Sequence, residues 1–337
     1  MVSDVWEHEW LQGLLCELIE DAHRRGDAGQ FPVLAERVAT AVNRSLGFDP
    51  AGLEDAARTG AEILGRDSYL PLGRLVEPAQ VAAIQAYLAD RPARAPFLPD
   101  KPFFAQDSIP DDVNFLDFDR ADVITCPHVL DILNHPRVLS LVSAQLGGLP
   151  TLHCAIIRRS YAGRAVAREN QLFHSDPWHC LRFVKLFIYL SDVDDAAGPH
   201  VYVRGSHDAE DLQARIQARV AAHPADAGRF DILLTSERKP DSVVADFFDA
   251  KDIVAMPGPA GTAFIGNTRA LHKGRLPDRG DRLALIGLYG LLPGLRPALR
   301  GRPLSGADYA AHHRETYGEG LFSNHLSYIN RMLTRWE

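Results

Sequence analysis

The sequence predicts a mainly β fold with flanking helices, arranged as a double-sheet jelly roll, also called a double-stranded β-helix. From about residue 150 onward, short apolar segments rich in β-branched and aromatic residues alternate with Gly and Pro turns. Amphipathic helix patterns lie on both sides of this region. With 337 residues, 46% of them hydrophobic, the chain is long enough for one large domain with accessory segments.

The composition excludes several classes of partner. A formal net charge of −8 provides no basic surface for nucleic acid. The four cysteines lie far apart without a C-x-x-C pair, which is typical of reduced thiols in the cytosol. The N-terminus lacks the basic and apolar regions of a signal peptide, and no apolar run approaches 18 residues. We therefore expect a cytoplasmic protein with neither a nucleic-acid nor a membrane partner.

Residues 1–65 are predicted to form a helical N-terminal extension. Trp6, Trp10, Leu14 and Leu18 recur at helical spacing in an apolar stripe that stops at Gly26. A second helix is expected at Pro32–Leu46, and a third is expected to begin with Asp49 as cap and Pro50 in its first turn. Such stripes usually pack on a neighbouring domain or on a second copy of the chain, so a homo-oligomer through these helices is possible.

The central domain is predicted to span 66–295. It begins with a strand at Ser68–Leu75 and a helix at Ala79–Leu88. Five prolines in Arg91–Asp122 predict a long surface loop, and loops of this size near a site often act as lids. A helix is expected at Val129–Leu146, stopped by the glycine pair at 147–148.

The rest of the domain reads mostly as strands. An insertion of mixed helix and loop, about 208–250, interrupts them, and a helical tail is expected at 296–337. The predicted strands are Thr151–Tyr161, Leu172–Asp176, Arg182–Leu190, His200–Arg204, Asp252–Met256, Thr262–Gly266 and Arg282–Leu291.

One short motif indicates a metal site. His174 and Asp176 lie two apart on a predicted strand, so an imidazole and a carboxylate point to the same face. Two His and one carboxylate on one side of a metal are the ligands of non-heme Fe(II) oxygenases. His272 qualifies as the third ligand, because it follows the strand Thr262–Gly266 at a sheet end. Arg282, at the start of the next strand, is suited to holding a carboxylate by two parallel hydrogen bonds.

At these residues the chain resembles the phytanoyl-CoA dioxygenase-like branch of the Fe(II)/2-oxoglutarate-dependent oxygenases. The resemblance spans roughly residues 66–292. Its motifs are DSYLPLGRLVEPAQVAAIQAYL near the start, the helix ILNHPRVLSLVSAQLG, the H-x-D, the run GPHVYVRGSH at 198–207, and His272 followed by Arg282.

The resemblance implies a site and a reaction. His174, Asp176 and His272 would bind Fe(II), Arg282 would bind the distal carboxylate of 2-oxoglutarate, and O2 would be the oxidant. The default outcome is hydroxylation of a small-molecule substrate with release of succinate and CO2. A carboxylate at Asp176 disfavours halogenation, since halogenases of this superfamily replace it with a small residue. Lys185 falls where the family often has a hydroxyl residue, and is expected to bind cosubstrate or a substrate anion.

Substrate contacts are expected from two places. Trp178 and His179 follow the H-x-D and are candidate pocket walls. Strand alternation places Lys185, Phe187 and Tyr189 on one face, which makes Tyr189 a further candidate.

Other interpretations remain open. His179 and Cys180 lie close enough to His174 for a zinc cluster, and a zinc hydrolase on the same scaffold is one alternative. A jelly-roll binding module without catalysis is another. Several further motifs have structural or surface explanations: the turn Gly205–His207, the pair His313-x-Glu315 in the tail helix, and the turn arginines Arg275 and Arg279.

Overall fold

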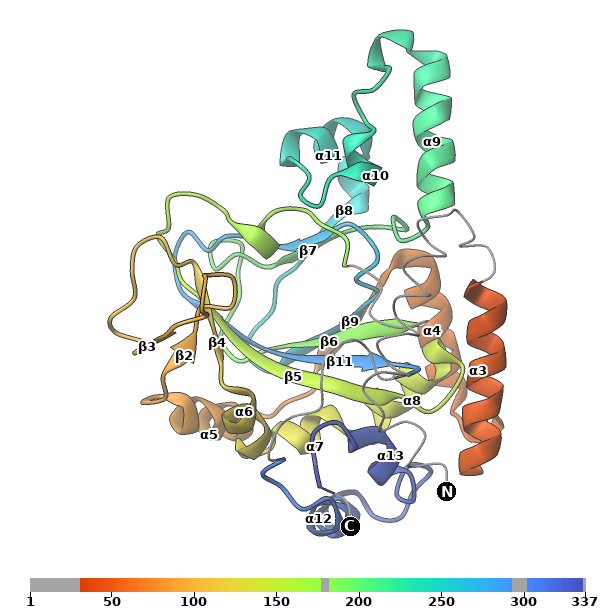
Figure 1. The fold of residues 1–337 in the computed structure, drawn as a ribbon, viewed down its shortest axis with the longest axis vertical. Coiled ribbons are helices and arrows are strands. Elements are labelled where there is room, and N and C mark those ends of the chain that lie inside the picture. The colour runs from red at the N-terminus through yellow and green to blue at the C-terminus, as the bar shows by residue number, and fades with distance from the viewer. Residues whose placement is uncertain (1–30, 177–181, 293–301, 336–337) are drawn as a thin grey trace.

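The computed structural model describes residues 31–176, 182–292 and 302–335, and within them two antiparallel β-sheets face each other (Figure 1). The major sheet has eight strands in the order β1-β9-β6-β11-β5-β4-β2-β3, and the minor sheet has the order β10-β7-β8. This arrangement confirms the predicted jelly-roll fold class. The strands are β1 Tyr69–Arg74, β2 Ala93–Arg94, β3 Phe103–Phe104, β4 Phe115–Phe118, β5 Thr151–Ser160, β6 Phe183–Tyr189, β7 His200–Val203, β8 Ile253–Met256, β9 Thr262–Gly266, β10 His272–Gly274 and β11 Arg282–Gly290.

The major sheet has one face toward helices and one face toward the minor sheet. Strand alternation produces this division, because successive side chains point to opposite faces. On β11, Leu283 and Leu285 belong to the main hydrophobic core, whereas Ala284, Ile286 and Leu288 line a cavity between the sheets. β11 pairs with β5 on one side and β6 on the other, so it lies at the centre of this cavity wall.

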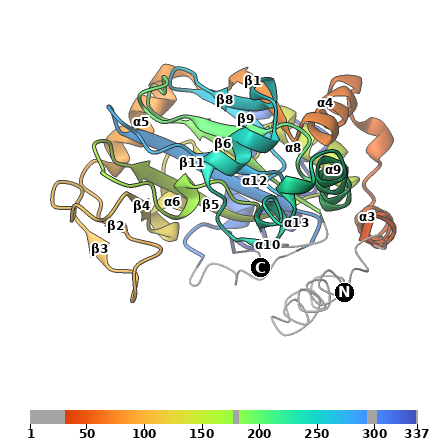
Figure 2. The same ribbon diagram turned by 90° about the horizontal axis from the view of Figure 1, so that it is seen from above.

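Helices cover the outer face of the major sheet (Figure 1). Their buried side chains join those of the sheet in one core, which includes Ala57 and Leu64 from the N-terminal region and Ile329 from the tail. Seen from above, α3 and α4 lie at one side of the sheet and β2 to β4 at the other (Figure 2). The helices are α3 Phe31–Leu46, α4 Asp55–Asp67, α5 Pro78–Leu88, α6 Arg120–Thr125, α7 Val129–Leu133, α8 Pro136–Leu146, α12 Gly306–Tyr317 and α13 Leu326–Asn330.

Two predicted segments differ from the structure. The helix expected over Val129–Leu146 is broken into α7 and α8, because Pro136 lacks an amide donor and disfavours helical backbone at the residue before it. The loop expected at Arg91–Asp122 contains three short strands that extend the major sheet past β5. Its prolines lie outside these strands, so a proline count alone did not reveal them.

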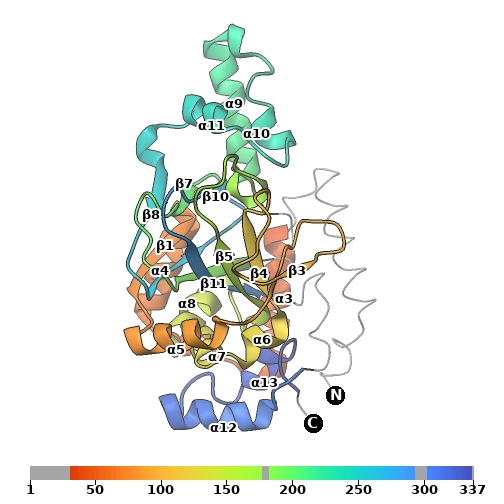
Figure 3. The same ribbon diagram turned by 90° about the vertical axis from the view of Figure 1, so that its left-hand side faces the viewer.

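The insertion after β7 consists of helices joined by loops. Its elements α9 Ala209–Ala222, α10 Ile232–Thr235 and α11 Asp241–Phe247 project from the minor sheet (Figure 3). Asp208 caps α9 by accepting hydrogen bonds from the amides of the first turn. A separate hydrophobic cluster joins these helices to the outer face of the minor sheet, and includes Leu212, Ile216, Phe230, Leu233 and Val244 with Val201 and Val203.

The N-terminal extension is described only from Phe31. The predicted helix Pro32–Leu46 corresponds to α3, and Asp49 caps a short 3-10 turn at Pro50–Gly52 ahead of α4. The first predicted helix, with its suggested oligomer contact, lies outside the described residues. None of the described helices has the length and apolar character needed to cross a membrane.

Candidate metal centre

His174, Asp176 and His272 converge between the two sheets. One candidate ligand atom from each lies within 4.8 Å of the other two, and all three side chains are buried. Over the described ranges, this is the one group of three or more His, Cys, Asp or Glu side chains that meets this geometry. The structure therefore brings together the three residues that the sequence singled out.

Main-chain pairing holds the two histidines in place. The His174 amide donates to the His272 carbonyl at 3.0 Å, and the His272 amide donates back to the His174 carbonyl at 2.9 Å. The Asp176 amide donates to Thr268 at 2.8 Å. The predicted strand Leu172–Asp176 is thus reduced to two isolated bridges, of which His174 to His272 attaches the segment to β10 and Phe173 to Lys239 attaches it to the insertion.

The histidine rings are oriented by their Nδ1 atoms. Nδ1 of His174 lies 2.8 Å from the carbonyl oxygen of Leu172, and Nδ1 of His272 lies 2.9 Å from that of Ala270. A carbonyl only accepts hydrogen bonds, so each Nδ1 carries a proton and each Nε2 retains a lone pair. This is the tautomer of a metal-binding histidine whose second nitrogen is held by the protein.

The charge states suit a cation. Burial lowers the pKa of His174 well below its ordinary value, and it also lowers the pKa of His272, so both rings are neutral near pH 7. Burial alone would raise the pKa of Asp176, but the Lys185 ammonium and the two imidazoles outweigh it and hold that pKa well below the ordinary range. The centre thus offers two neutral nitrogens and one carboxylate.

Lys185 contacts the carboxylate directly. Its Nζ donates to Oδ2 of Asp176 at 2.5 Å, while Oδ1 lies 3.9 Å from Nε2 of His174. One carboxylate oxygen is therefore held by the lysine and the other faces the histidine. From the sequence, Lys185 is predicted to contact a cosubstrate or substrate, whereas in the structure its ammonium binds Asp176.

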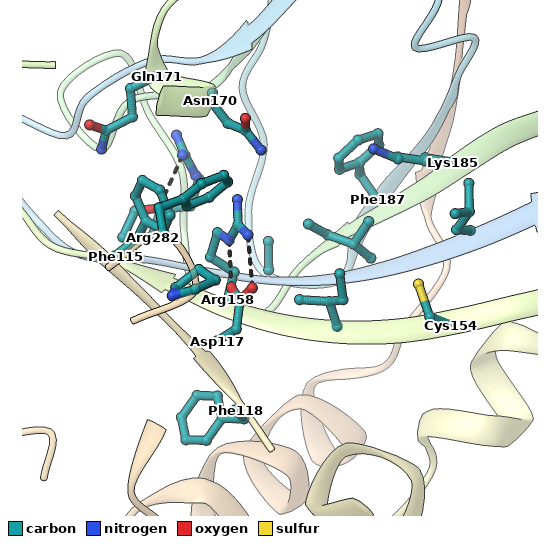
Figure 4. A pocket seen from close by; sticks show the side chains of 18 of the residues that line it. Phe115, Asp117, Phe118, Cys154, Arg158, Asn170, Gln171, Lys185, Phe187 and Arg282 are labelled. Atoms are coloured by element: carbon teal, nitrogen blue, oxygen red, sulfur yellow. Dashed lines mark hydrogen bonds and ion pairs between the residues drawn. The ribbon is translucent and has the colours of Figure 1, made fainter. Parts of the chain in front are cut away.

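A cavity of about 810 Å³ opens beside the centre (Figure 4). Alternate residues of β5 and β11 form one wall, while β7 and β10 supply the opposite one. The segment containing β2 to β4, expected from the sequence to be a lid, contributes the remaining side. The lining includes His174, His272, Lys185, Phe187, His200, Gly274, Arg282, Ser160, Arg158, Ile156, Cys154, Ile286, Leu288, Phe115 and Asp117.

Arg282 lies at one end of this cavity and is only 4% exposed. Its Nη1 donates to the carbonyl of Arg275 at 2.9 Å, and its Nη2 donates to Oγ of Ser160 at 3.3 Å. Burial lowers its pKa to about 10, so the guanidinium remains charged at neutral pH. The side chains of Arg275 and Arg279 are 41% and 83% exposed, which fits the prediction that these two are solvated.

Gly274 makes room for the Arg282 side chain. A Cβ added to Gly274 would lie 2.7 Å from Nη2 of Arg282, closer than ordinary packing allows. His200 is the β7 partner of Gly274 and lines the same part of the cavity. Burial lowers the pKa of His200 well below its ordinary value, and its buried Nδ1 has no hydrogen-bond partner in the described structure. From the sequence, His200 is predicted only to lie in a strand. The position of His200 in the cavity depends on the register of β7 and β10.

A buried ion pair also lies in the cavity wall and was not predicted from the sequence. Arg158 of β5 binds Asp117 of β4 through two parallel hydrogen bonds, Nε to Oδ1 at 2.6 Å and Nη2 to Oδ2 at 2.8 Å. Both residues line the cavity. Because Asp117 lies in the segment predicted to be a loop, its strand pairing with Arg158 had no signal in the sequence.

The remaining candidate residues either lie outside the described residues or do not line the cavity. Trp178, His179 and Cys180 lie outside the described residues. Tyr189 is fully buried, and its hydroxyl donates to Met256 at 2.7 Å and accepts from the His200 amide at 3.1 Å. It is not part of the cavity lining, so this structure corrects the expectation that Tyr189 contacts substrate and places it behind the pocket wall.

The two secondary motifs have structural roles. Ser206 bonds main-chain groups of Val203 and Leu271, and His207 bonds the hydroxyl of Ser68. In α12, His313 is buried against the carbonyl of Asn134 whereas Glu315 is exposed, so these two side chains do not form a half-site.

The sequence model of the phytanoyl-CoA dioxygenase (PhyH) family matches residues 65–276. No curated protein matches the chain. Similar solved structures include AviO1 from Streptomyces viridochromogenes Tue57, with 15% identity, coverage of 71% of this chain and 95% of that one, and a TM-score of 0.43. HygX from Streptomyces hygroscopicus with nickel and 2-oxoglutarate bound has 17% identity, 69% and 86% coverage, and a TM-score of 0.45.

Proposed function

The chain belongs to the phytanoyl-CoA dioxygenase (PhyH) family, and we propose that it is an Fe(II)- and 2-oxoglutarate-dependent dioxygenase that hydroxylates a small molecule. One observation carries this proposal. His174, Asp176 and His272 present two Nε2 lone pairs and a carboxylate to one buried point, with Arg282 at the end of the adjoining cavity.

The donor set fits ferrous iron. Two imidazoles and one carboxylate on one side of a metal leave the remaining positions open for exchangeable ligands. The Nδ1–H bonds to Leu172 and Ala270 fix the ring orientation before a metal arrives. Asp176 would bind through Oδ1, because Lys185 already holds Oδ2.

The end of the cavity fits 2-oxoglutarate. Arg282 is a buried cation aimed into the cavity, and guanidinium groups hold carboxylates by two parallel hydrogen bonds. Gly274 leaves the space that this side chain needs, and the unpaired Nδ1 of His200 provides a second polar contact nearby. Iron with this cosubstrate supplies oxidation of a substrate C–H bond by O2, coupled to decarboxylation of 2-oxoglutarate to succinate and CO2.

The protein itself supplies position and shelter. Phe187, Ile156 and Ile286 form apolar walls beside the centre, which keep water away from the reacting groups and orient the substrate. His174, Asp176 and His272 would hold the metal, and the bridge between His174 and His272 fixes the spacing of the two histidines.

The experiment measures 2-oxoglutarate consumption by the purified full-length protein. We expect succinate to form only when both Fe(II) and O2 are present, and more of it when a panel of small molecules includes the substrate. His174→Ala should abolish turnover, while His223→Ala, at an exposed position after α9, should not. A product carrying one additional oxygen atom would identify the reaction as hydroxylation.

The alternative functions give different results in the same assay. A zinc hydrolase would act without O2 or 2-oxoglutarate, and a binding module would retain its ligand after treatment with a chelator. Either result, together with the absence of succinate, would refute the dioxygenase proposal.

A further inference from the structure

A second charged group lies on the cavity wall beside Arg282. Arg158 and Arg282 belong to adjacent strands, and in the register of β5 and β11 Ser160 lies opposite Arg282 while Arg158 lies opposite Ala284. Both guanidinium groups line the same cavity (Figure 4). Arg158 is therefore a neighbour of the proposed 2-oxoglutarate site but is not the residue that closes its end.

The hydrogen bonds of Arg158 leave part of its guanidinium available. Of its five N–H groups, one on Nε and one on Nη2 are directed at Asp117. The structure shows no partner for Nη1 among the described residues. Asp117 occupies the side of the guanidinium that Nε and Nη2 form. The outer edge of the guanidinium presents one N–H from each Nη atom and therefore stays free to bind a second group with two oxygens.

Neighbouring groups hold Arg158 rigidly. Its guanidinium carbon lies 4.6 Å from the centre of the Phe115 ring and 5.9 Å from that of Phe97. Its side chain is 16% exposed and that of Asp117 is 17% exposed. Burial alone would lower the pKa of Arg158, but Asp117 more than offsets this, so the group stays a cation. A rigid donor loses little conformational entropy when it binds a ligand.

The cavity lining carries more positive than negative charge. Arg94, Lys101 and Arg120 line it together with Arg158, whereas the acidic side chains in the same lining are Asp117 and Asp119. Asp119 lies 3.5 Å from Arg94 and so offsets part of that charge. The remaining positive field favours an anionic molecule in the cavity.

We propose that Arg158 anchors the substrate by binding a carboxylate or phosphate group through the free edge of its guanidinium. The proposal rests on the proposed function and names its substrate class: an organic oxyanion with an apolar body. Ile156 and Ile286 form the next inward-facing pair along β5 and β11 from Arg158, and Leu288 lies opposite Lys185, which binds Asp176. These three apolar residues line the cavity and would contact that body. Asp117 acts as a positioning residue, because it fixes the direction in which the guanidinium points.

The test is a binding measurement that needs no turnover. The full-length protein is loaded with Ni(II) in place of iron and with 2-oxoglutarate, and is titrated calorimetrically with phenylacetate, phenyl phosphate and neutral phenylacetamide. We expect both anions to bind at least about tenfold more tightly than the amide. Arg158→Gln should remove most of this difference.

Two further variants separate anchoring from folding and from general charge effects. Arg158→Lys keeps a cation beside Asp117 but loses the planar fork, so it should also weaken both anions by about tenfold. Arg314→Gln removes the same charge from α12, where the side chain is 40% exposed, and should leave binding unchanged. Thermal melts of each variant show whether it is folded.

Specific results would overturn the proposal. Anion binding that is equal in the wild type and in folded Arg158→Lys protein would refute it. Weaker 2-oxoglutarate binding by the Arg158 variants, measured without probe, would make Arg158 a cosubstrate residue and would also refute it. If the protein makes no succinate but anion binding still requires Arg158, the dioxygenase proposal falls and the oxyanion site stands.

Discussion

His174 and His272 exchange both of their main-chain hydrogen bonds, and their ring centres lie 4.3 Å apart. In an antiparallel pair of this kind, the two side chains leave the backbone on the same face. The pairing therefore sets the distance between the imidazoles before any metal binds. A histidine ligand far away in the sequence becomes a neighbour through strand pairing alone.

Loss of one of these histidines should abolish metal binding. We expect His272→Ala to weaken Fe(II) or Ni(II) affinity by more than about 100-fold, because even residues that only orient a ligand contribute about 10- to 100-fold. Calorimetric titration with Ni(II) under anaerobic conditions measures this. His223→Ala serves as the matched control at an exposed position. Unchanged affinity in His272→Ala would exclude this centre as the metal site.

Gly274→Ala should impair cosubstrate binding while sparing the metal. The added methyl group would lie 2.7 Å from Nη2 of Arg282 and push the guanidinium out of position. We expect 2-oxoglutarate affinity to fall by about tenfold or more, since a charge-assisted bond contributes roughly 1.5–3 kcal/mol. Gly65→Ala in α4, where nothing lies within 4 Å of the added atom, is the control. Equal effects of both variants would argue against the assigned role of Arg282.

The metal-free protein should lose stability as the pH falls below about 6.5. Burial lowers the pKa of His174, His200 and His272 in the folded state, so the unfolded chain takes up protons first. Stability is full above the unfolded pKa and declines toward the lower folded pKa, by up to about 1.4 kcal/mol per pH unit for each such histidine. Denaturant titrations between pH 7.5 and about pH 5 measure the slope.

A variant of His200 tests whether buried histidines cause this loss of stability at low pH. His200→Phe removes one buried titrating ring in contact with Phe187 and Phe264, and should reduce the pH slope of stability. A slope equal to that of the wild type would show that His200 takes up its proton similarly in both states.

The C-terminal tail should be coupled to the core through one amide pair. Asn134 and Asn330 donate to each other's Oδ1 at 3.0 Å, and both are fully buried. Asn330→Ala removes the amide that donates to the buried Oδ1 of Asn134, while Nδ2 of Asn134 keeps its bond to the Leu130 carbonyl. The loss of this donor should cost about 2–3 kcal/mol of unfolding free energy. Asn324→Ala, exposed on the same tail, should change little. A comparable loss in both variants would contradict this coupling.

Local patterns predicted much of the framework. Apolar runs rich in β-branched and aromatic residues predicted three central strands of the major sheet, β6, β9 and β11, within one or two residues of their ends. The helix α5 was predicted because Glu77 and Pro78 mark its start. The strands β2 to β4 have too few residues to show a period, and they form by pairing in succession, β4 on β5, β2 on β4 and β3 on β2.

The sequence alone determined the identity of the three candidate ligands and of Arg282, because H-x-D spacing and a sheet-end histidine are local features that follow from strand geometry. Tertiary structure decided which groups surround them. The Lys185 contact with Asp176, the Gly274 clearance for Arg282 and the Arg158–Asp117 pair each join two different segments of the chain. Strand register sets these contacts, and register depends on how the whole sheet buries its faces, which no single segment encodes.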